Sequence, residues 1–255
     1  MGPRYAVIVL SNPVMAKPRP WTVLDYETPH RVDDTLWWVD GQLPRIPIGR
    51  RMSVIRLADG RLVIHSAIAL REEDMKAIED WGIPSFLVFP NHFHCMDGPA
   101  YKQRYPDIKV LCPAPSRAKL EGLVEIDGDY SLLPDDEHLR TESIRGGKDR
   151  ESIFVVEHSD GSKTLLFNDL LFNIESVSGF SGLIVKMLGS VGGPRVTRIA
   201  KWLIVDDKAA VADHLRELAN VPNLVRIVPG HGLIIEHNPA DTLRAVADRL
   251  HKQSS

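Results

Sequence analysis

Two histidines spaced two residues apart are the first candidates for metal chemistry in this sequence. His92 and His94 follow the continuously apolar segment Ser85–Phe89, which is typical of a strand buried on both faces. Side chains at positions i and i+2 of an extended chain point the same way, so the two imidazoles can face one point. This spacing suits a zinc-like ion, and Asp97 can fold back into the same space. The competing interpretation is a pair of loop histidines that bind backbone groups.

A carboxylate and a third histidine follow two other apolar strands. Asp169 comes after the segment Thr164–Phe167, and His231 lies in the motif Pro-Gly-His-Gly after the segment Leu224–Val228. A carboxylate at the end of a buried strand lies over the sheet edge where the sites of α/β proteins usually form. The glycines beside His231 allow a sharp turn and a close approach to a ligand. Taken alone, each residue is also consistent with an ordinary turn.

Strands and helices alternate along the chain, and hairpins separate some of them. This pattern predicts a layered α/β protein with mixed sheets. From the periodicity of apolar residues and the turn residues between them, we expect strands at residues 36–39, 52–57, 62–65, 85–89, 109–112, 153–158, 163–167 and 224–228, and helices at 71–81, 99–105, 207–219 and 239–251.

The order of these motifs resembles that of the metallo-β-lactamase superfamily. In that family an H-x-H-x-D-H loop follows a strand, a G-H-T-P-G-S-like loop comes next, a hairpin leads to Gly-Asp, and Pro-Gly-His lies near the C-terminus. The resemblance covers the chain from Leu36 to its end and implies an αβ/βα four-layer sandwich of two mixed β-sheets flanked by helices. An uncharacterised branch of the family is similar in more detail, at Arg56–Leu62, His65-Ser66, Pro90-Asn91 and His94.

The first histidine loop departs from the family pattern. When His92 and His94 are aligned with the first two family ligands, Met96 stands at the ligand aspartate and Asp97 at the next ligand histidine. The third loop of the family also carries a histidine, but the segment Arg145–Ser152 contains none. Two complete metal positions are therefore not expected.

The remaining ligands imply a centre that holds at most one metal ion. Asp169 and His231 match the bridging aspartate and the last histidine of the family. The resemblance implies one divalent ion, with zinc expected first and iron or manganese as alternatives, held by His92, His94, Asp169 and His231. Asp97 and Asp169 are the candidate catalytic residues, Asp97 as a ligand or a general base. A protein without any metal is the alternative.

Two classes of function remain open at this stage. One is a metal-dependent hydrolase-like protein that acts on a small ester, lactone, thioester or phosphoester. The other is a non-catalytic relative that keeps the fold as a ligand-binding or interaction module. Lys148 stands near the position of the missing histidine, where its ammonium group could pair with Asp97 or Asp169 and bind an anionic ligand. The competing interpretation of Lys148 is a solvated loop residue.

His65 is a candidate for a supporting role. It stands where the wider family often has an aspartate that orients a ligand histidine, so it could contact such a ligand from behind. The competing interpretation is a histidine satisfied within the core.

Composition and charge exclude several classes of protein. The chain has 255 residues, 31 basic and 34 acidic side chains and a formal net charge of −3, which is ordinary for a globular protein and argues against a nucleic-acid binder. Two cysteines are too few for a disulfide scaffold, so we expect a reducing, cytoplasmic location, although the apolar N-terminus also resembles a short signal peptide. No apolar run is long enough to predict a membrane span.

The chain divides into an arm and one domain. We expect an N-terminal arm at residues 1–35 and a metallo-β-lactamase-like domain at 36–255, with a helical, lid-like insertion at about 176–205. The apolar and basic residues of 180–205 could cover a small-molecule site, form a homodimer contact or lie on a membrane surface. A helix pair buried on its own domain is the alternative.

Overall fold

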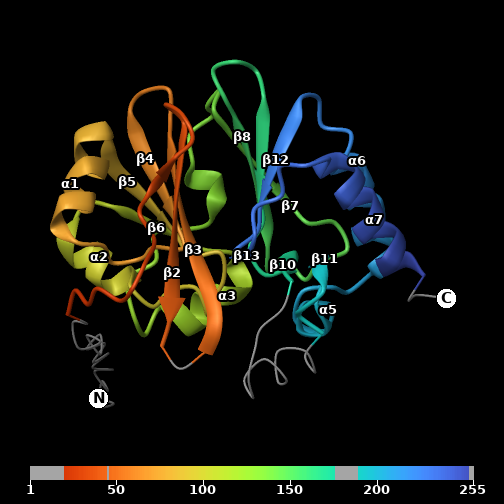
Figure 1. Ribbon diagram of the computed structural model, residues 1–255. Helices are drawn as coiled ribbons and strands as arrows, with labels where there is room; N and C mark the ends of the chain where they lie inside the picture. The colour runs from red at the N-terminus through yellow and green to blue at the C-terminus, as the bar shows by residue number, and fades with distance from the viewer. Residues whose placement is uncertain (1–19, 45, 176–188, 253–255) are drawn as a thin grey trace, which may run out of the picture.

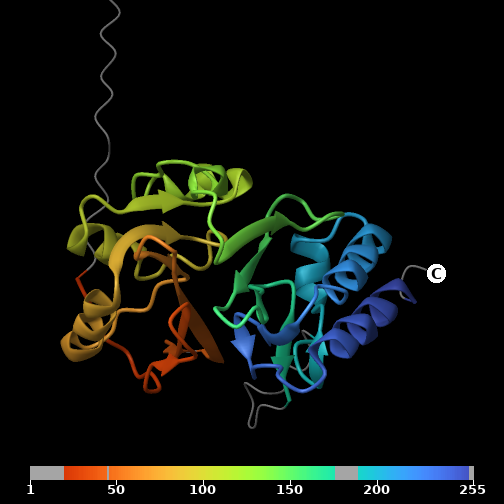
Figure 2. The same ribbon diagram turned by 90° about the horizontal axis from the view of Figure 1, so that it is seen from above.

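Two β-sheets face each other at the centre of the molecule, and helices lie outside both of them (Figures 1 and 2). The computed structural model describes residues 20–44, 46–175 and 189–252. The layer order is therefore helix, sheet, sheet, helix, which confirms the predicted four-layer sandwich.

The first sheet has six strands that are neighbours in chain order. The first four strands pair antiparallel, whereas β4, β5 and β6 run parallel. The parallel strands end at one edge of the sheet, and the predicted histidine loop follows β5 at that edge. The strands are β1 (His30–Arg31), β2 (Leu36–Leu43), β3 (Ile46–Arg56), β4 (Arg61–His65), β5 (Ile83–Val88) and β6 (Lys109–Leu111).

The second half of the chain forms a four-stranded sheet in the order β12-β9-β8-β7 and a small sheet in the order β11-β10-β13. Parallel pairs join β12 to β9 and β10 to β13. The strands are β7 (Leu139–Ser143), β8 (Ser152–Glu157), β9 (Lys163–Leu166), β10 (Phe172–Ile174), β11 (Gly193–Arg195), β12 (Leu224–Val228) and β13 (His231–Gly232).

Helices cover the outer face of each sheet. The helices α1, α2 and α3 pack on the first sheet, whereas α5, α6 and α7 pack on the second. Their bounds are α1 (Glu72–Trp81), α2 (Gly98–Arg104), α3 (Ala114–Leu120), α5 (Arg198–Leu203), α6 (Lys208–Leu218) and α7 (Pro239–His251), and a short 3-10 helix spans Tyr130–Leu132.

The alternation of side chains along each central strand produces these layers. In β4, Leu62 and Ile64 pack toward the helices of the first half, whereas Val63 packs into the core between the sheets. In β8, Phe154 faces the first sheet, and its neighbours at 153 and 155 face α6 and α7. Because successive residues of a strand point to opposite faces, a strand that is apolar throughout must be covered on both sides.

The segment expected as an insertion differs from the prediction in one respect. The insertion expected at about 176–205 is not helical throughout, because Gly193–Arg195 form the strand β11. The helix α5 begins at Arg198 because the hydroxyl of Thr197 caps it, accepting a hydrogen bond from the Ala200 amide at 3.0 Å. Residues 176–188 of the expected insertion and residues 1–19 of the expected N-terminal arm lie outside the described residues.

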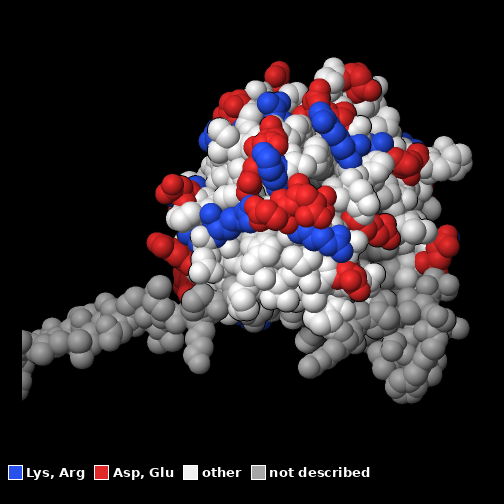
Figure 3. All heavy atoms as spheres, turned by 60° about the vertical axis from the view of Figure 1, so that its left-hand side comes forward, with Lys and Arg blue, Asp and Glu red and all other residues white. Residues whose placement is uncertain are grey.

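The surface on the side of α1 and α2 carries interspersed acidic and basic side chains (Figure 3). One network there joins the two helices, because Arg104 of α2 forms ion pairs with Glu72 and Glu79 of α1. Among the described residues, no helix is long and apolar enough to cross a membrane.

Candidate metal centre

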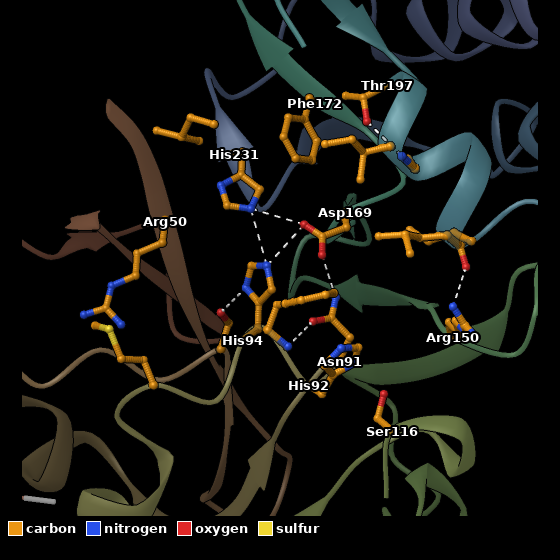
Figure 4. Close-up of a pocket in the computed structure, with 18 of the residues that line it drawn as sticks. Arg50, Asn91, His92, His94, Ser116, Arg150, Asp169, Phe172, Thr197 and His231 are labelled. Atoms are coloured by element: carbon orange, nitrogen blue, oxygen red, sulfur yellow. Dashed lines mark hydrogen bonds and ion pairs between the residues drawn. The ribbon is translucent and has the colours of Figure 1, made fainter. Parts of the chain in front are cut away.

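Three side chains converge at the edge where the two halves of the molecule meet (Figure 4). One carboxylate oxygen of Asp169 lies 3.2 Å from Nε2 of His94 and 3.2 Å from Nε2 of His231. The two imidazole Nε2 atoms are 3.4 Å apart. Two ligands of a tetrahedral zinc ion, each bonded at ~2.05 Å, are separated by about 3.3 Å. The three atoms therefore form a triangle of the size that one such ion requires.

The three residues come from the ends of strands in both halves. His94 lies in the loop after β5, Asp169 follows β9, and His231 begins β13 after the turn that ends β12. Because β9 and β12 are parallel, with Leu166 opposite Val228, the two segments that follow them leave the second sheet at the same edge. The two sheets pack face to face, so this edge lies beside the end of β5.

The far nitrogen of each imidazole has a partner that fixes the ring. Nδ1 of His231 lies 2.6 Å from the carbonyl oxygen of Gly49, and Nδ1 of His94 lies 2.9 Å from the hydroxyl of Ser66. A carbonyl oxygen only accepts hydrogen bonds, so Nδ1 of His231 carries the proton, and in the neutral ring Nε2 presents a lone pair to the centre. Ligand histidines of metal sites are held by their other nitrogen in this way.

Asp169 is held as a carboxylate. Burial raises the pKa of this group, but the rings of His94 and His231 outweigh burial and hold the pKa well below its usual range. The other carboxylate oxygen accepts a hydrogen bond of 2.6 Å from the side-chain amide of Asn91. Asp169 therefore has one oxygen committed to the triangle and one to a protein donor.

A buried glutamate positions the loop that carries Asp169. The carboxylate of Glu151 accepts hydrogen bonds from the backbone amides of Asn168, Asp169 and Leu170, at 2.8 to 3.0 Å. Burial and the charge of Asp169 raise the pKa of Glu151 to about 8, against the effect of the three amides. The sequence analysis missed this residue, and the available signal was an acidic residue directly before an apolar strand.

A buried arginine positions the turn that carries His231. Arg51 of β3 donates hydrogen bonds to the carbonyl oxygens of Pro229 at 2.5 Å and Gly232 at 2.8 Å, and it forms an ion pair of 2.6 Å with Asp40. Gly232 has φ +88°, and a Cβ atom there would lie 2.1 Å from the carbonyl oxygen of Asn173. The strand β3 and Gly232 together fix the position of His231. The sequence analysis did not identify Arg51.

The structure does not bring His92 and Asp97 into the triangle. Nε2 of His92 instead lies 3.1 Å from the ammonium group of Lys119. Burial, followed by the charges of Lys119 and Arg150, lowers the pKa of His92. Asp97 is buried and paired with Arg50 at 2.7 Å.

Lys148 and His65 also lie apart from the three converging groups. The ammonium group of Lys148 donates to the carbonyl oxygen of Trp202 at 2.8 Å, and Lys148 does not line the cavity at the site. His65 is buried with its ring edge-on to Phe154, and burial lowers its pKa to about 3. The side chain that contacts His94 from behind is that of the next residue, Ser66.

A cavity of about 560 Å³ opens over the three converging groups, which is within the usual range for a small-molecule site. Its walls are mainly apolar, with cationic and hydroxyl groups at separate places. The helix α5 contributes to these walls. The lining residues include Leu43, Ile48, Arg50, Asn91, His92, Met96, Ser116, Lys119, Arg150, Phe172, Thr197, Ile199, Leu203 and Ile204.

Comparison with solved structures identifies the architecture. The crystal structure of DIM-1 metallo-β-lactamase exposed to ceftazidime matches with a TM-score of 0.59 and 13% identity, over 89% of this chain and 99% of that one. The chain has the metallo-β-lactamase fold. TMB-1 matches with a TM-score of 0.57 and 15% identity, over 92% of this chain and 100% of that one. A metallo-β-lactamase from Pontibacter korlensis matches with a TM-score of 0.58 and 10% identity, over 88% of this chain and 99% of that one.

The metallo-β-lactamase fold explains why strand ends from two sheets meet at one edge, and it confirms the fold that the order of the motifs implied. No protein-family model and no curated protein matches the chain. Identities of 10–15% establish the fold alone. The function of this chain therefore depends on its own residues and not on the fold alone.

Proposed function

We propose that this protein is a hydrolase with a single divalent metal ion, held by His94, Asp169 and His231. Its substrates are small esters, lactones, thioesters or phosphoesters. The observation that carries the proposal is the triangle of ligand atoms with edges of 3.2, 3.2 and 3.4 Å. Three protein ligands and one open position are the usual arrangement of a catalytic zinc site.

The atoms of the triangle require a cation between them. Because Nδ1 of His231 donates to the Gly49 carbonyl, Nε2 is the nitrogen that turns toward the Asp169 carboxylate, 3.2 Å away. At this distance a nitrogen lone pair and a carboxylate oxygen repel each other, so either a proton or a metal ion must lie between them. Two imidazole nitrogens and one carboxylate oxygen suit zinc first, and iron or manganese accept the same donors.

The remaining groups of the site would bind and orient the substrate. The amide of Asn91 holds Asp169 in place, and the apolar walls of the cavity exclude water from the bound substrate. In the reaction, the oxygen of a water molecule bonds to the acyl carbon or phosphorus, the bond to the leaving oxygen or sulfur breaks, and the leaving group gains a proton from that water. A divalent ion bound here would polarise the substrate and lower the pKa of the water.

Metal analysis followed by an activity screen tests the proposal. Protein purified without chelator or metal-affinity resin is expected to hold about one ion per chain by elemental analysis, and a His94→Gln, His231→Gln double variant is expected to hold none. The intact protein should hydrolyse at least one member of a panel of nitrophenyl esters, lactones, thioesters and phosphodiesters, and the double variant should not.

Two results would contradict the proposal. If the protein takes up no zinc, iron or manganese even after reconstitution with each, there is no metal centre. If the ion binds but every class of substrate on the panel stays intact, a ligand-binding role without hydrolysis is favoured instead.

A further inference from the structure

Two cations line the cavity without an acidic partner. Lys119 bonds to Nε2 of the His92 ring at 3.1 Å, and Arg150 donates to the carbonyl oxygen of Leu203 at 3.0 Å. Within residues 20–44, 46–175 and 189–252, neither cation forms an ion pair. By contrast, the third cation of the cavity wall, Arg50, is neutralised by Asp97 at 2.7 Å.

The cavity itself supplies no counter-charge for these two cations. Among its described lining residues, Asp169 is the one acidic side chain, and its oxygens are committed to the two histidines and to Asn91. The part of the cavity beside Lys119 and Arg150 therefore carries an excess of positive charge. Such a charge attracts an anionic group from solution.

Polar groups gather on the wall that carries the cations. Ser116 and Lys119 lie three residues apart on α3, so both face the cavity from the same side of this helix. Figure 4 places Ser116 and Arg150 on the opposite side of the metal centre from Arg50. The planar guanidinium of Arg150 suits the two oxygens of a carboxylate.

The remaining walls are apolar and extend past the metal centre. Phe172 lies beside the ring of His231, with ring centroids 4.6 Å apart. The helix α5 and the residue after it contribute Ile199, Leu203 and Ile204, and the β2–β3 side contributes Leu43 and Ile48. A ligand in the cavity would meet apolar surface on these sides, the metal centre at the middle and the cations on the α3 side.

We propose that the substrate is an amphipathic monoanion: its carboxylate binds to Lys119 and Arg150, its apolar part packs against α5 and Phe172, and its hydrolysable bond lies at the metal centre. This inference rests on the proposed function only for the position of the hydrolysable bond. The carboxylate subsite itself depends on side chains outside the metal triangle, so it can be tested in the metal-free protein.

The first experiment measures binding without metal. Hexanoate and the isosteric neutral hexanamide are titrated calorimetrically into chelator-treated protein. Hexanoate should bind at least about tenfold more tightly than hexanamide, because charge-assisted hydrogen bonds outweigh neutral ones. In Lys119→Met and in Arg150→Met the preference should fall by about tenfold, and Lys119→Arg should restore it. Lys76→Met removes a cation from α1, far from the cavity lining, and should leave the preference unchanged.

The second experiment compares two esters with the metal-loaded protein. The mono-nitrophenyl ester of glutarate carries a carboxylate, and nitrophenyl butanoate is its neutral counterpart. The ratio of kcat/KM for the anionic ester to that for the neutral ester should fall about tenfold in Lys119→Met relative to the intact protein and to Lys76→Met.

The outcomes separate the two proposals. Equal binding of hexanoate and hexanamide, or a preference that survives both methionine variants, would overturn the carboxylate subsite even if esters are hydrolysed. A selective loss of hexanoate binding in both variants would support the subsite, even if neither ester is hydrolysed and the proposed function fails.

Discussion

His92 and His94 differ in role although they are two residues apart. The expectation that both face one ion assumes an extended chain, but Asn91 forms a turn there: its side-chain oxygen accepts a hydrogen bond of 2.8 Å from the Phe93 amide. The His94 amide also bonds to the Asn91 carbonyl at 3.3 Å. Because the loop bends, the two imidazoles point to different neighbours.

Single substitutions should separate these two histidines. His94→Gln is expected to abolish metal binding, because it removes one of three ligands, whereas His92→Gln should keep about one ion per chain. Elemental analysis after dialysis checks both variants, with circular dichroism as the control for folding. Loss of the ion in His92→Gln as well would support the four-ligand set predicted from the sequence.

Glu151 should control the affinity for the ion without touching it. In Glu151→Gln one oxygen is replaced by an amide group that faces backbone N–H donors, so the loop bearing Asp169 loses its anchor. We expect the dissociation constant of zinc to rise about 10–100-fold, as for other groups that support ligands. Competition with a fluorescent chelator measures this change, and Glu157→Gln at the other end of β8 is the matched control. An unchanged affinity would show that Glu151 has no positioning role.

His65 should make stability depend on pH. Burial, aided by the nearby His94, lowers its pKa to about 3, whereas in the unfolded chain the pKa is about 6.5. The unfolded state therefore binds this proton more readily, so the contribution of His65 is complete above pH ~6.5 and is lost as the pH falls toward about 3. This one group lowers the unfolding free energy by up to about 1.4 kcal/mol per pH unit in that window.

Urea unfolding of the metal-free protein checks this expectation. Between pH 6.5 and pH 4.5, a His65→Leu variant should lose stability less steeply than the intact protein, because it has no buried imidazole to protonate. Parallel curves for the two proteins would mean that His65 gains a proton in the folded state as readily as in the unfolded state.

At the scale of elements, the strand β3 of the first half contacts the turn around His231 in the second half. Its Arg51 bonds to both ends of the turn around His231, and the carbonyl of Gly49 holds the imidazole itself. These contacts join residues about 180 positions apart in the chain. We therefore expect the strand to affect both stability and the proposed metal centre.

An Arg51→Met variant tests this connection. It leaves two carbonyl oxygens and the partly exposed carboxylate of Asp40 without their donor. We expect the unfolding free energy to fall by about 1–3 kcal/mol and the dissociation constant of zinc to rise about tenfold. Arg61→Met, which removes a partly exposed arginine of β4, is the control. Reduced stability with unchanged zinc affinity would limit Arg51 to a structural role.

At the scale of the whole molecule, the proposed metal centre joins the two halves. His94 comes from the half that contains the first sheet, whereas Asp169 and His231 come from the half that contains the second. An ion bound between them would be present in the folded state and absent from the unfolded one. Binding would then stabilise the entire fold.

Stabilisation by zinc is therefore expected. At a free zinc concentration of about 100 times the dissociation constant, the unfolding free energy should rise by about 2.7 kcal/mol. Urea titrations of the intact protein with and without zinc measure this gain, and the same titrations of His94→Gln should show none. An equal gain in His94→Gln would place the bound ion elsewhere.

Local patterns predicted much of the architecture. The alternation of apolar strands and helices predicted a layered α/β protein with its site at the strand ends, and the resemblance of the motif order to the metallo-β-lactamase superfamily implied the four-layer sandwich. His94, Asp169 and His231 were all among the predicted ligands. Strand periodicity and turn residues act over a few neighbouring positions, so they can be read without the fold.

The tertiary structure alone decided which residues of that edge act together. The turn at Asn91 separates the side chains of His92 and His94. Lys148 donates to a carbonyl oxygen of α5, whereas Arg150 lines the cavity. Glu151 and Arg51 became positioning residues through backbone groups that are distant in sequence. Hydrogen bonds form only when the donor and acceptor are placed to within a few tenths of an ångström, and that placement exists only once the two sheets have packed.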